Sequence, residues 1–195
     1  MIFVTVGTQK FQMNRLLKKM DEYAKDHPDI KVVVQSGHSD YVPKYCETYQ
    51  FMDRPKFEEC INNCSVLVSH GGVGTIMEGI RRQKPVVVVP RLREFGEHVD
   101  DHQMEAAMAL KHNRCILLCM NIDFLDYIVD NAMDYKYNIF QEPIHRVEDL
   151  VLECIEDDSD IHPRKGFFGS IKNILGMFEK DDSEMKQSQD NKAII

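Results

Sequence analysis

A strand, a glycine-rich turn and a helix start follow one another in the middle of the chain, and this order constrains the fold most. Residues 66–68 read Val-Leu-Val, an apolar β-branched run typical of a buried parallel strand. Gly71, Gly72 and Gly74 come next, followed by Thr75 and apolar residues at helical spacing. Glycines let the backbone approach an anion closely, and the first N–H groups of a helix point at it. The block therefore predicts a phosphate site.

Three polar side chains accompany this turn and are candidate ligands. His70 precedes the glycines and is expected to donate a hydrogen bond to phosphate; the alternative is a satisfied core histidine. Thr75 is expected to bind phosphate, to cap the helix, or to do both. Glu78 falls further along the helix, within reach of the ribose hydroxyls of a nucleotide, unless it is a solvated helix residue. The expected ligand is a nucleoside diphosphate.

Strand and helix patterns alternate along the chain. The expected strands cover residues 2–6, 31–35, 49–52, 66–69, 86–89 and 115–119. The expected helices cover residues 11–20, 55–61, the segment after the glycines, 98–112, 123–131 and 147–155. This alternation predicts a Rossmann-like α/β fold, a parallel sheet with helices on both faces and ligands at the carboxyl ends of the strands. Gly7 and Thr8 follow the first strand, so they are expected to face the same crevice.

The composition fits one acidic domain. The chain has 195 residues and a formal net charge of −8, which argues against a general affinity for nucleic acid. One basic cluster interrupts the acidity: Arg81, Arg82, Lys84, Arg91 and Arg93. It is either a solvated helix end or a local attraction for phosphate, an anionic lipid or a partner.

Several other features point to a chain without disulfides, metal or a membrane span. Six cysteines lie at positions 46, 60, 64, 115, 119 and 154, without the two-residue gap of zinc knuckles, and are expected to be buried thiols. The acidic triplet at residues 158–160 is expected to be a solvated loop and not a metal site. Met1 leads directly into the first strand and no apolar run approaches the length of a membrane span, so we expect a cytoplasmic protein.

Two common nucleotide motifs are absent from this sequence. The dinucleotide fingerprint needs G-x-G-x-x-G after the first strand, but the first turn has only Gly7, and the block at Gly72 and Gly74 lacks the third glycine. The lysine of a Walker A motif is missing as well.

The same residues resemble the donor half of a GT-B glycosyltransferase. His70-x-Gly72 with Glu78 eight residues after the histidine looks like a donor signature of UDP-sugar transferases. The opening VTVGTQKFQMNRLL, at residues 4–17, is similar to the start of the glycosyltransferase family 28 C-terminal domain. The segment FGEHVDDHQ, at 95–103, resembles the small subunit of two-subunit bacterial exopolysaccharide and capsule transferases; the small subunit of the eukaryotic transferase that extends dolichyl-pyrophosphate-GlcNAc is related.

The resemblance implies an activity and further site residues. Asp101, His102 and Gln103 are expected to contact the nucleotide sugar. Glu97 and His98 are the catalytic candidates, in contact with the phosphates or the acceptor; the alternative is a capping pair. The implied reaction transfers a hexose or hexuronic acid from a UDP-sugar to a lipid-pyrophosphate-linked acceptor, with inversion and without a metal or cofactor. The general base is unassigned, because in two-domain relatives it comes from the acceptor half.

The implied partner is a membrane-associated acceptor-binding subunit, which would hold the protein at the inner face of the membrane. The alternative function is a non-catalytic accessory subunit that stabilises or stimulates another transferase. We expect the nucleotide-sugar-binding domain at residues 1–160, an amphipathic helix at 161–180 and a polar, disordered tail at 181–195. The apolar stripe within 166–180 is expected to pack on its own sheet or to dock on the partner.

Overall fold

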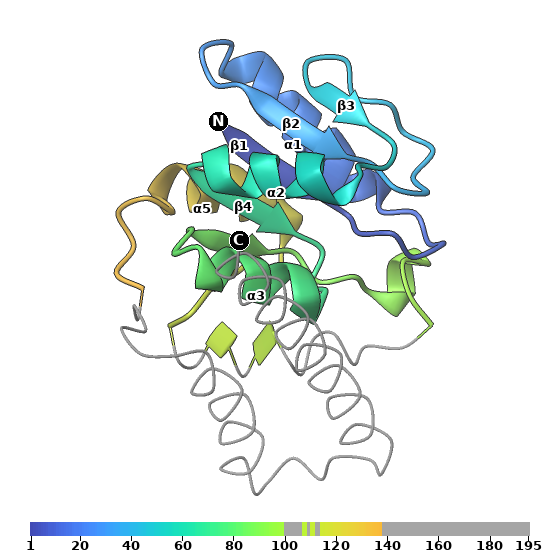
Figure 1. Ribbon diagram of the computed structural model, residues 1–195. Coiled ribbons are helices and arrows are strands. Elements are labelled where there is room, and N and C mark those ends of the chain that lie inside the picture. Colours follow the sequence, from blue (N-terminus) through green and yellow to red (C-terminus); the bar gives the residue numbers. More distant parts are fainter. Residues whose placement is uncertain (100–106, 109, 112–113, 138–195) are drawn as a thin grey trace, which may run out of the picture. The chain divides into compact units, whose positions relative to one another are not determined.

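Among the described residues, a parallel sheet with the strand order β3-β2-β1-β4-β5-β6 forms the centre of the computed structural model (Figure 1). The structure describes residues 1–99, 107–108, 110–111 and 114–137, which belong to one compact unit, Met1–Ile144. The strands are β1 (Ile2–Thr5), β2 (Val32–Gln35), β3 (Glu47–Tyr49), β4 (Val66–Ser69), β5 (Val86–Val88) and β6 (Leu117–Leu118). The Rossmann-like α/β class is thereby confirmed.

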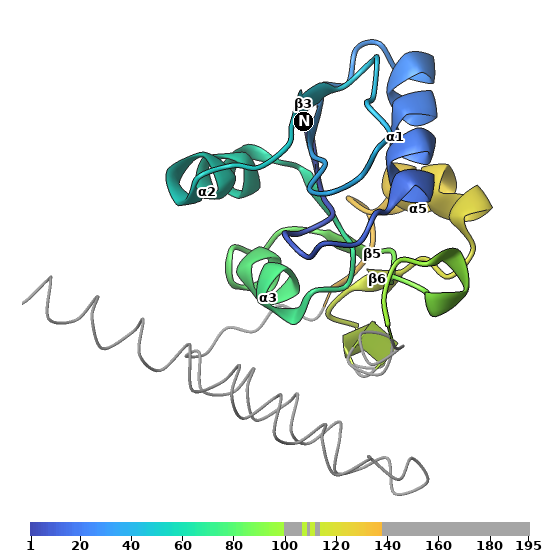
Figure 2. The ribbon, with the colours of Figure 1, turned by 90° about the vertical axis from the view of Figure 1, so that its right-hand side faces the viewer.

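Helices cover both faces of the sheet. They are α1 (Asn14–Asp26), α2 (Arg54–Asn63), α3 (Val73–Arg81) and α5 (Leu125–Asn131), with short 3-10 turns η1 (Arg93–Phe95) and η2 (Ile122–Phe124). Figure 2 shows α2 and α3 on one face and α1 and α5 on the other. No helix in the described part of the chain is long and apolar enough to cross a bilayer.

Each central strand is buried on both faces, which explains its uninterrupted apolar sequence. In β1, Phe3 lies edge-on to Phe57 of α2, with ring centroids 5.4 Å apart. Its neighbour Val4 belongs to the opposite core, together with Leu16 and Leu17 of α1. Successive strand residues point to opposite faces, so one short strand contributes to both layers.

Two polar contacts fasten α5 to α1. Lys19 pairs with Asp126 at 2.6 Å, and the hydroxyl of Tyr23 donates to Asp130 at 2.7 Å. Each contact joins residues 107 positions apart, so together they hold α5 beside α1 on the same face of the sheet.

The predicted element boundaries need several corrections. The first helix begins at Asn14, so Phe11 precedes it and is not part of its apolar face. The third strand covers Glu47–Tyr49 and not 49–52, because Tyr49 pairs with Gln35 and Asp53 already caps α2 by accepting from the N–H of Lys56. The last strand is shorter than predicted, since only Leu117 and Leu118 pair with β5.

Some sequence predictions fall partly or wholly outside the described residues. Of the helix expected at 98–112, residues 107, 108, 110 and 111 are helical, whereas His98 and Val99 are not, so the predicted start is wrong; the other residues lie outside the described ones. The helix at 147–155, the acidic triplet at 158–160, the domain limits at 160 and 180, the helix at 161–180 and the tail at 181–195 lie outside.

The prediction of buried thiols holds for four of the five cysteines that the structure describes. Cys60, Cys64, Cys115 and Cys119 are buried thiols outside any disulfide, whereas the Cys46 thiol is only half-buried. Burial raises the pKa of the Cys64 thiol to about 11, so this sulfur stays protonated and packs as a small apolar group. Cys154 lies outside the described residues.

Candidate nucleotide-sugar site

The loops that follow β1, β4 and β5 meet at one edge of the sheet. In the parallel register Thr5 lies beside Ser69, and Ser69 lies beside Val88. We call residues 6–13 the β1 loop and residues 89–98 the β5 loop. The backbone N–H of His70 donates to the Thr5 carbonyl at 3.2 Å, and the N–H of Arg91 donates to the His70 carbonyl at 3.3 Å. These contacts confirm the expected convergence of the two glycine turns at the carboxyl edge.

The imidazole of His70 fills the space between the two glycine turns. A Cβ on Gly7 would lie 2.5 Å from Cε1 of this ring, and a Cβ on Gly72 would lie 2.6 Å from Nε2. Gly7 also has a φ of +74°, which side-chain-bearing residues rarely adopt. Both positions therefore require glycine, and the reason is close packing against one buried histidine.

His70 is neutral in this environment. It is 5% exposed, and its Nδ1 lies 3.3 Å from the Thr5 carbonyl, which can only accept, so Nδ1 carries the proton. Burial, the charge of Arg91 and the neighbouring His98 lower the pKa of His70 to about 4, against the smaller opposing effect of the Thr5 hydrogen bond. In this tautomer Nε2 has no proton to give. The contacts of His70 in the structure are those of a satisfied core histidine, and donation to phosphate stays a prediction.

The second glycine turn leads into α3 without a side-chain cap. Gly72 is the N-cap residue, and no described side chain caps the first turn. Gly74 and Thr75 lie inside that turn, so the cap role proposed for Thr75 is wrong. Because the first backbone N–H groups of a helix lack internal acceptors, this end of α3 suits an anion. Gly71, with a φ of +97°, makes the turn that directs the chain into it.

Glu78 lies on α3 and is paired with Arg82 in the structure. The Glu78 side chain is 22% exposed, so a ligand can still reach it. Arg82 also donates to the Asn62 side chain at 2.9 Å, which holds the guanidinium toward α2. A ribose bound by Glu78 would thus share the carboxylate with Arg82.

The basic cluster seen in the sequence is divided by β5. Arg82 and Lys84 precede this strand, and Lys84 donates to the Asn62 and Cys64 carbonyls at 2.6 and 3.1 Å. Arg91 and Arg93 follow the strand, at the carboxyl edge. Arg91 is fully buried. The cluster is neither one solvated helix end nor one surface patch, because parallel strands carry their two ends to opposite edges of the sheet.

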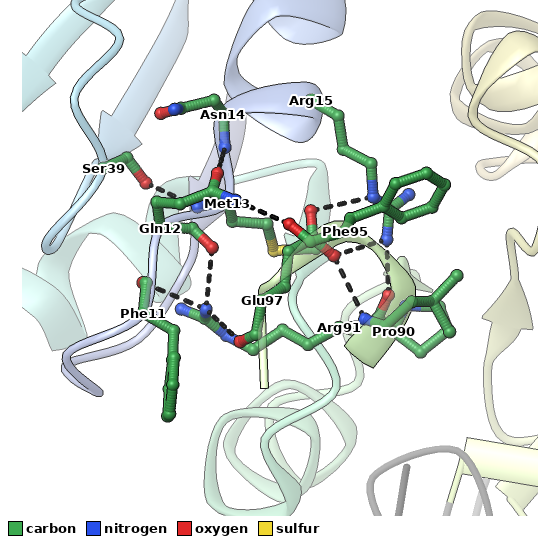
Figure 3. Close-up of polar contacts among 11 residues, drawn as sticks. Phe11, Gln12, Met13, Asn14, Arg15, Ser39, Pro90, Arg91, Phe95 and Glu97 are labelled. Atoms are coloured by element: carbon green, nitrogen blue, oxygen red, sulfur yellow. Dashed lines mark hydrogen bonds and ion pairs between the residues drawn. The ribbon is translucent and has the colours of Figure 1, made fainter. Parts of the chain in front are cut away.

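Arg91 binds backbone carbonyls of two loops at once (Figure 3). One nitrogen, Nη1, donates to Phe11, Gln12 and Glu97 at 3.0, 3.2 and 3.0 Å, and the other, Nη2, donates to Val6 at 2.6 Å. Its Nε has no hydrogen-bond partner among the described atoms. A guanidinium carries five donors in a fixed planar array, so this one side chain satisfies four carbonyls.

The Glu97 carboxylate is also fully engaged. Arg15 holds it in a bidentate pair, with Nε and Nη2 each 2.9 Å from one oxygen, and the Leu92 N–H donates to it at 3.1 Å. Glu97 is 1% exposed. These three donors link the carboxylate to α1 through Arg15 and to the start of the β5 loop through Leu92, and a catalytic role of Glu97 stays a prediction.

The remaining candidates are only partly described. Thr8 is exposed at the tip of the β1 loop. The His98 ring lies against Phe11, with ring centroids 5.5 Å apart. Asp101, His102 and Gln103 lie outside the described residues, so their sugar contacts stay a prediction.

Sequence reasoning missed Arg15 and assigned Arg91 to a surface cluster. Arg15 lies on a helix whose pattern suggests an ordinary solvated charge, and its partner is 82 positions away. For Arg91 the sequence did hold a signal, because this residue follows an apolar strand and Pro90. A charged side chain so close to a buried strand needs hydrogen-bond partners.

The parallel sheet with helices on both faces is the Rossmann-like fold of GT-B glycosyltransferase C-terminal domains, and here it carries two glycine turns at its carboxyl edge. The profile of the Glycosyltransferase family 28 C-terminal domain matches residues 1–142, and the chain belongs to this family.

A relative and two solved structures are similar to the chain. The UDP-N-acetylglucosamine transferase subunit ALG13 of Mus musculus is 27% identical over an alignment of 129 residues that covers 60% of this chain and 10% of the mouse protein. The chain therefore spans only a small part of that relative. The NMR solution structure of ALG13 matches with a TM-score of 0.55 at 16% identity, covering 80% of this chain and 96% of that one. The glycotransferase of kitacinnamycin matches with a TM-score of 0.53 at 19% identity, covering 80% and 38%.

Proposed function

We propose that this chain binds a UDP-sugar and acts as the donor-binding catalytic subunit of a glycosyltransferase. One observation carries the proposal: the two glycine turns converge on buried His70, next to the uncapped start of α3. Backbone N–H groups and the helix dipole at this point would bind the diphosphate and stabilise it as it leaves. Family membership supports a transferase, and the name of the mouse relative supports UDP as the nucleotide.

The finer proposal concerns the acceptor and the partner. We infer that a hexose or hexuronic acid passes, with inversion and without a metal, to a lipid-pyrophosphate-linked sugar in polysaccharide biosynthesis. A second, membrane-associated subunit would bind this acceptor and keep the protein at the cytoplasmic face of the membrane. The engaged carboxylate of Glu97 supports this division, because the base that deprotonates the acceptor must then come from another group.

Isothermal titration of the full chain tests the proposal. UDP and UDP-sugars are expected to bind, while GDP is expected to bind at least about tenfold more weakly, since a base-specific site discriminates by its hydrogen bonds. Equal affinity for UDP and GDP, or no binding of either, contradicts the proposal. A chain that binds UDP tightly but whose Glu78→Ala variant still supports transfer with its partner would be an accessory subunit.

A further inference from the structure

The β1 loop and the β5 loop are joined by a buried ionic network at the carboxyl edge of the sheet (Figure 3). Arg91 connects them through carbonyls of Val6, Phe11 and Gln12 on one side and of Glu97 on the other. Gln12 adds a further link, because its side-chain amide donates to the Phe95 carbonyl at 2.9 Å. The two loops therefore form one connected structure.

Arg15 ties this structure to the first turn of α1. Besides the bidentate pair with Glu97, its Nη2 donates to the Pro90 carbonyl at 2.6 Å, and its guanidinium lies 5.0 Å from the centre of the Phe95 ring. One side chain thus contacts the beginning, the middle and the end of the β5 loop. Loops usually move independently of their neighbours, and this one is held at three points.

The network lies directly behind the proposed donor site. Gly7 of the β1 loop is the residue that packs on His70, and Glu97 is followed at once by His98 and by the predicted sugar ligands at 101–103. The Arg15–Glu97 pair therefore holds the loop that carries Gly7 through the contacts of Arg91 with Val6, Phe11 and Gln12. Small displacements of groups that hold a ligand have large effects on affinity and rate.

The charges of the network are not balanced within it. It holds two guanidinium groups and one carboxylate: Arg15 pairs with the carboxylate of Glu97, whereas Arg91 donates to the Glu97 backbone carbonyl. The surplus positive charge is close to His70, whose pKa it helps to lower. This charge would attract a bound diphosphate. The network can therefore affect UDP affinity by positioning the loops or by its charge, and the two effects predict opposite changes when the negative charge of Glu97 is removed.

We propose that Glu97 and Arg15 are positioning residues of the donor site, whose buried pair holds the β5 loop against the β1 loop in the geometry that binds the diphosphate. The inference rests on the proposed function, since it assumes a nucleotide diphosphate at this edge. Glu97 does not touch the reacting atoms; it acts through the loops.

Three variants of the full chain separate position, charge and general stability. Glu97→Gln keeps the shape but removes a negative charge, so charge alone predicts tighter UDP binding and positioning predicts weaker binding. Arg15→Lys keeps the charge but cannot form the bidentate pair. Lys19→Met is the matched control: Lys19 lies one turn further along α1, is 20% exposed against 17% for Arg15, and pairs across the fold with Asp126, away from these loops.

UDP affinity is measured by isothermal titration at a temperature where circular dichroism shows each variant folded. We expect the dissociation constant to rise about tenfold in Glu97→Gln and Arg15→Lys and to stay within about twofold in Lys19→Met, although all three lower the melting temperature. A merely structural pair would leave the affinity of the folded protein unchanged.

Several results would overturn the inference. Tighter binding by Glu97→Gln would assign the effect to charge, and equal weakening by Lys19→Met would assign it to general destabilisation. Unchanged binding in both loop variants, with wild-type UDP binding intact, would refute the positioning role alone. If the wild type does not bind UDP, the proposed function is wrong and the positioning role fails with it. Should Glu97→Gln not fold, Arg15→Lys gives the deciding measurement.

Discussion

At the scale of single residues, His70 shows how burial changes the role of a side chain. From its position after a strand, this histidine was expected to donate to phosphate. In the structure it is a neutral ring whose only proton is directed at the Thr5 carbonyl. In the structure its ring packs between two backbone turns, and its low pKa couples its protonation to folding.

The buried neutral ring makes stability depend on pH. The pKa of His70 is about 4 in the folded chain and near 6.5 when unfolded, so between these values the unfolded chain binds the extra proton. The free energy of unfolding should therefore be highest above pH 6.5 and fall by about 3 kcal/mol toward pH 4 on account of this group. Urea unfolding across this range should show a flatter profile for His70→Asn. Exposed His38 is the control, and His38→Asn should keep the wild-type slope.

Glu78 is the residue on which nucleotide recognition is expected to depend most. If it binds the ribose hydroxyls, Glu78→Ala should weaken UDP binding by about 2 kcal/mol, the cost of losing charge-assisted hydrogen bonds. Glu58→Ala removes a comparable pair four residues apart, with Arg54 on α2, and should leave the dissociation constant unchanged. Titration calorimetry measures both. A Glu78→Ala variant that binds UDP like the wild type would remove this residue from the site.

At the scale of elements, the loops and not the strands carry the special requirements of this fold. Gly7 and Gly96 both have a positive φ, +74° and +67°. Only Gly7 is also crowded, because the His70 ring leaves no room for a Cβ, whereas nothing lies within 4 Å of a Cβ at Gly96. A comparison of the two glycines therefore distinguishes the cost of a positive φ from the cost of close packing.

Alanine at these two glycines should therefore have different effects. Gly96→Ala should lower the free energy of unfolding by about 1 kcal/mol, the cost of a side chain at positive φ. Gly7→Ala should cost about 2 kcal/mol more, because the ring of His70 or the β1 loop must move. Denaturant unfolding measures the difference. Equal losses would show that the ring yields easily and that the packing argument is wrong.

At the scale of the whole molecule, the proposed function gives this chain the donor site of the transferase and leaves the acceptor site to a partner. The isolated chain is expected to bind UDP but to transfer no sugar to a lipid-linked acceptor, because under the proposed function a second subunit binds the acceptor and provides the base. Incubating the purified chain with labelled UDP-sugar and lipid acceptor, with and without the partner, tests this. Efficient transfer by the chain alone would refute it.

Docking of the partner is expected to use the apolar stripe within residues 166–180. Truncation after residue 160 should abolish co-purification with the acceptor-binding subunit while UDP binding persists, because the glycine turns and the sheet lie before residue 137. The untruncated chain is the control. If truncation unfolds the domain, the stripe belongs to its own core and the docking hypothesis is wrong.

The sequence by itself determined the order of the described strands and helices and the place of the glycine turns, because these signals are local, whereas several element ends needed the structure. Val66–Ser69 and α3 follow from apolar runs and helical spacing, and the carboxyl edge as binding edge follows from their alternation. The tertiary structure alone decided the charge state of His70, the division of the basic cluster and the contact of Arg15 with Glu97. Each of these depends on burial or on partners brought together across 65 to 82 positions of chain, and no local pattern encodes such distances.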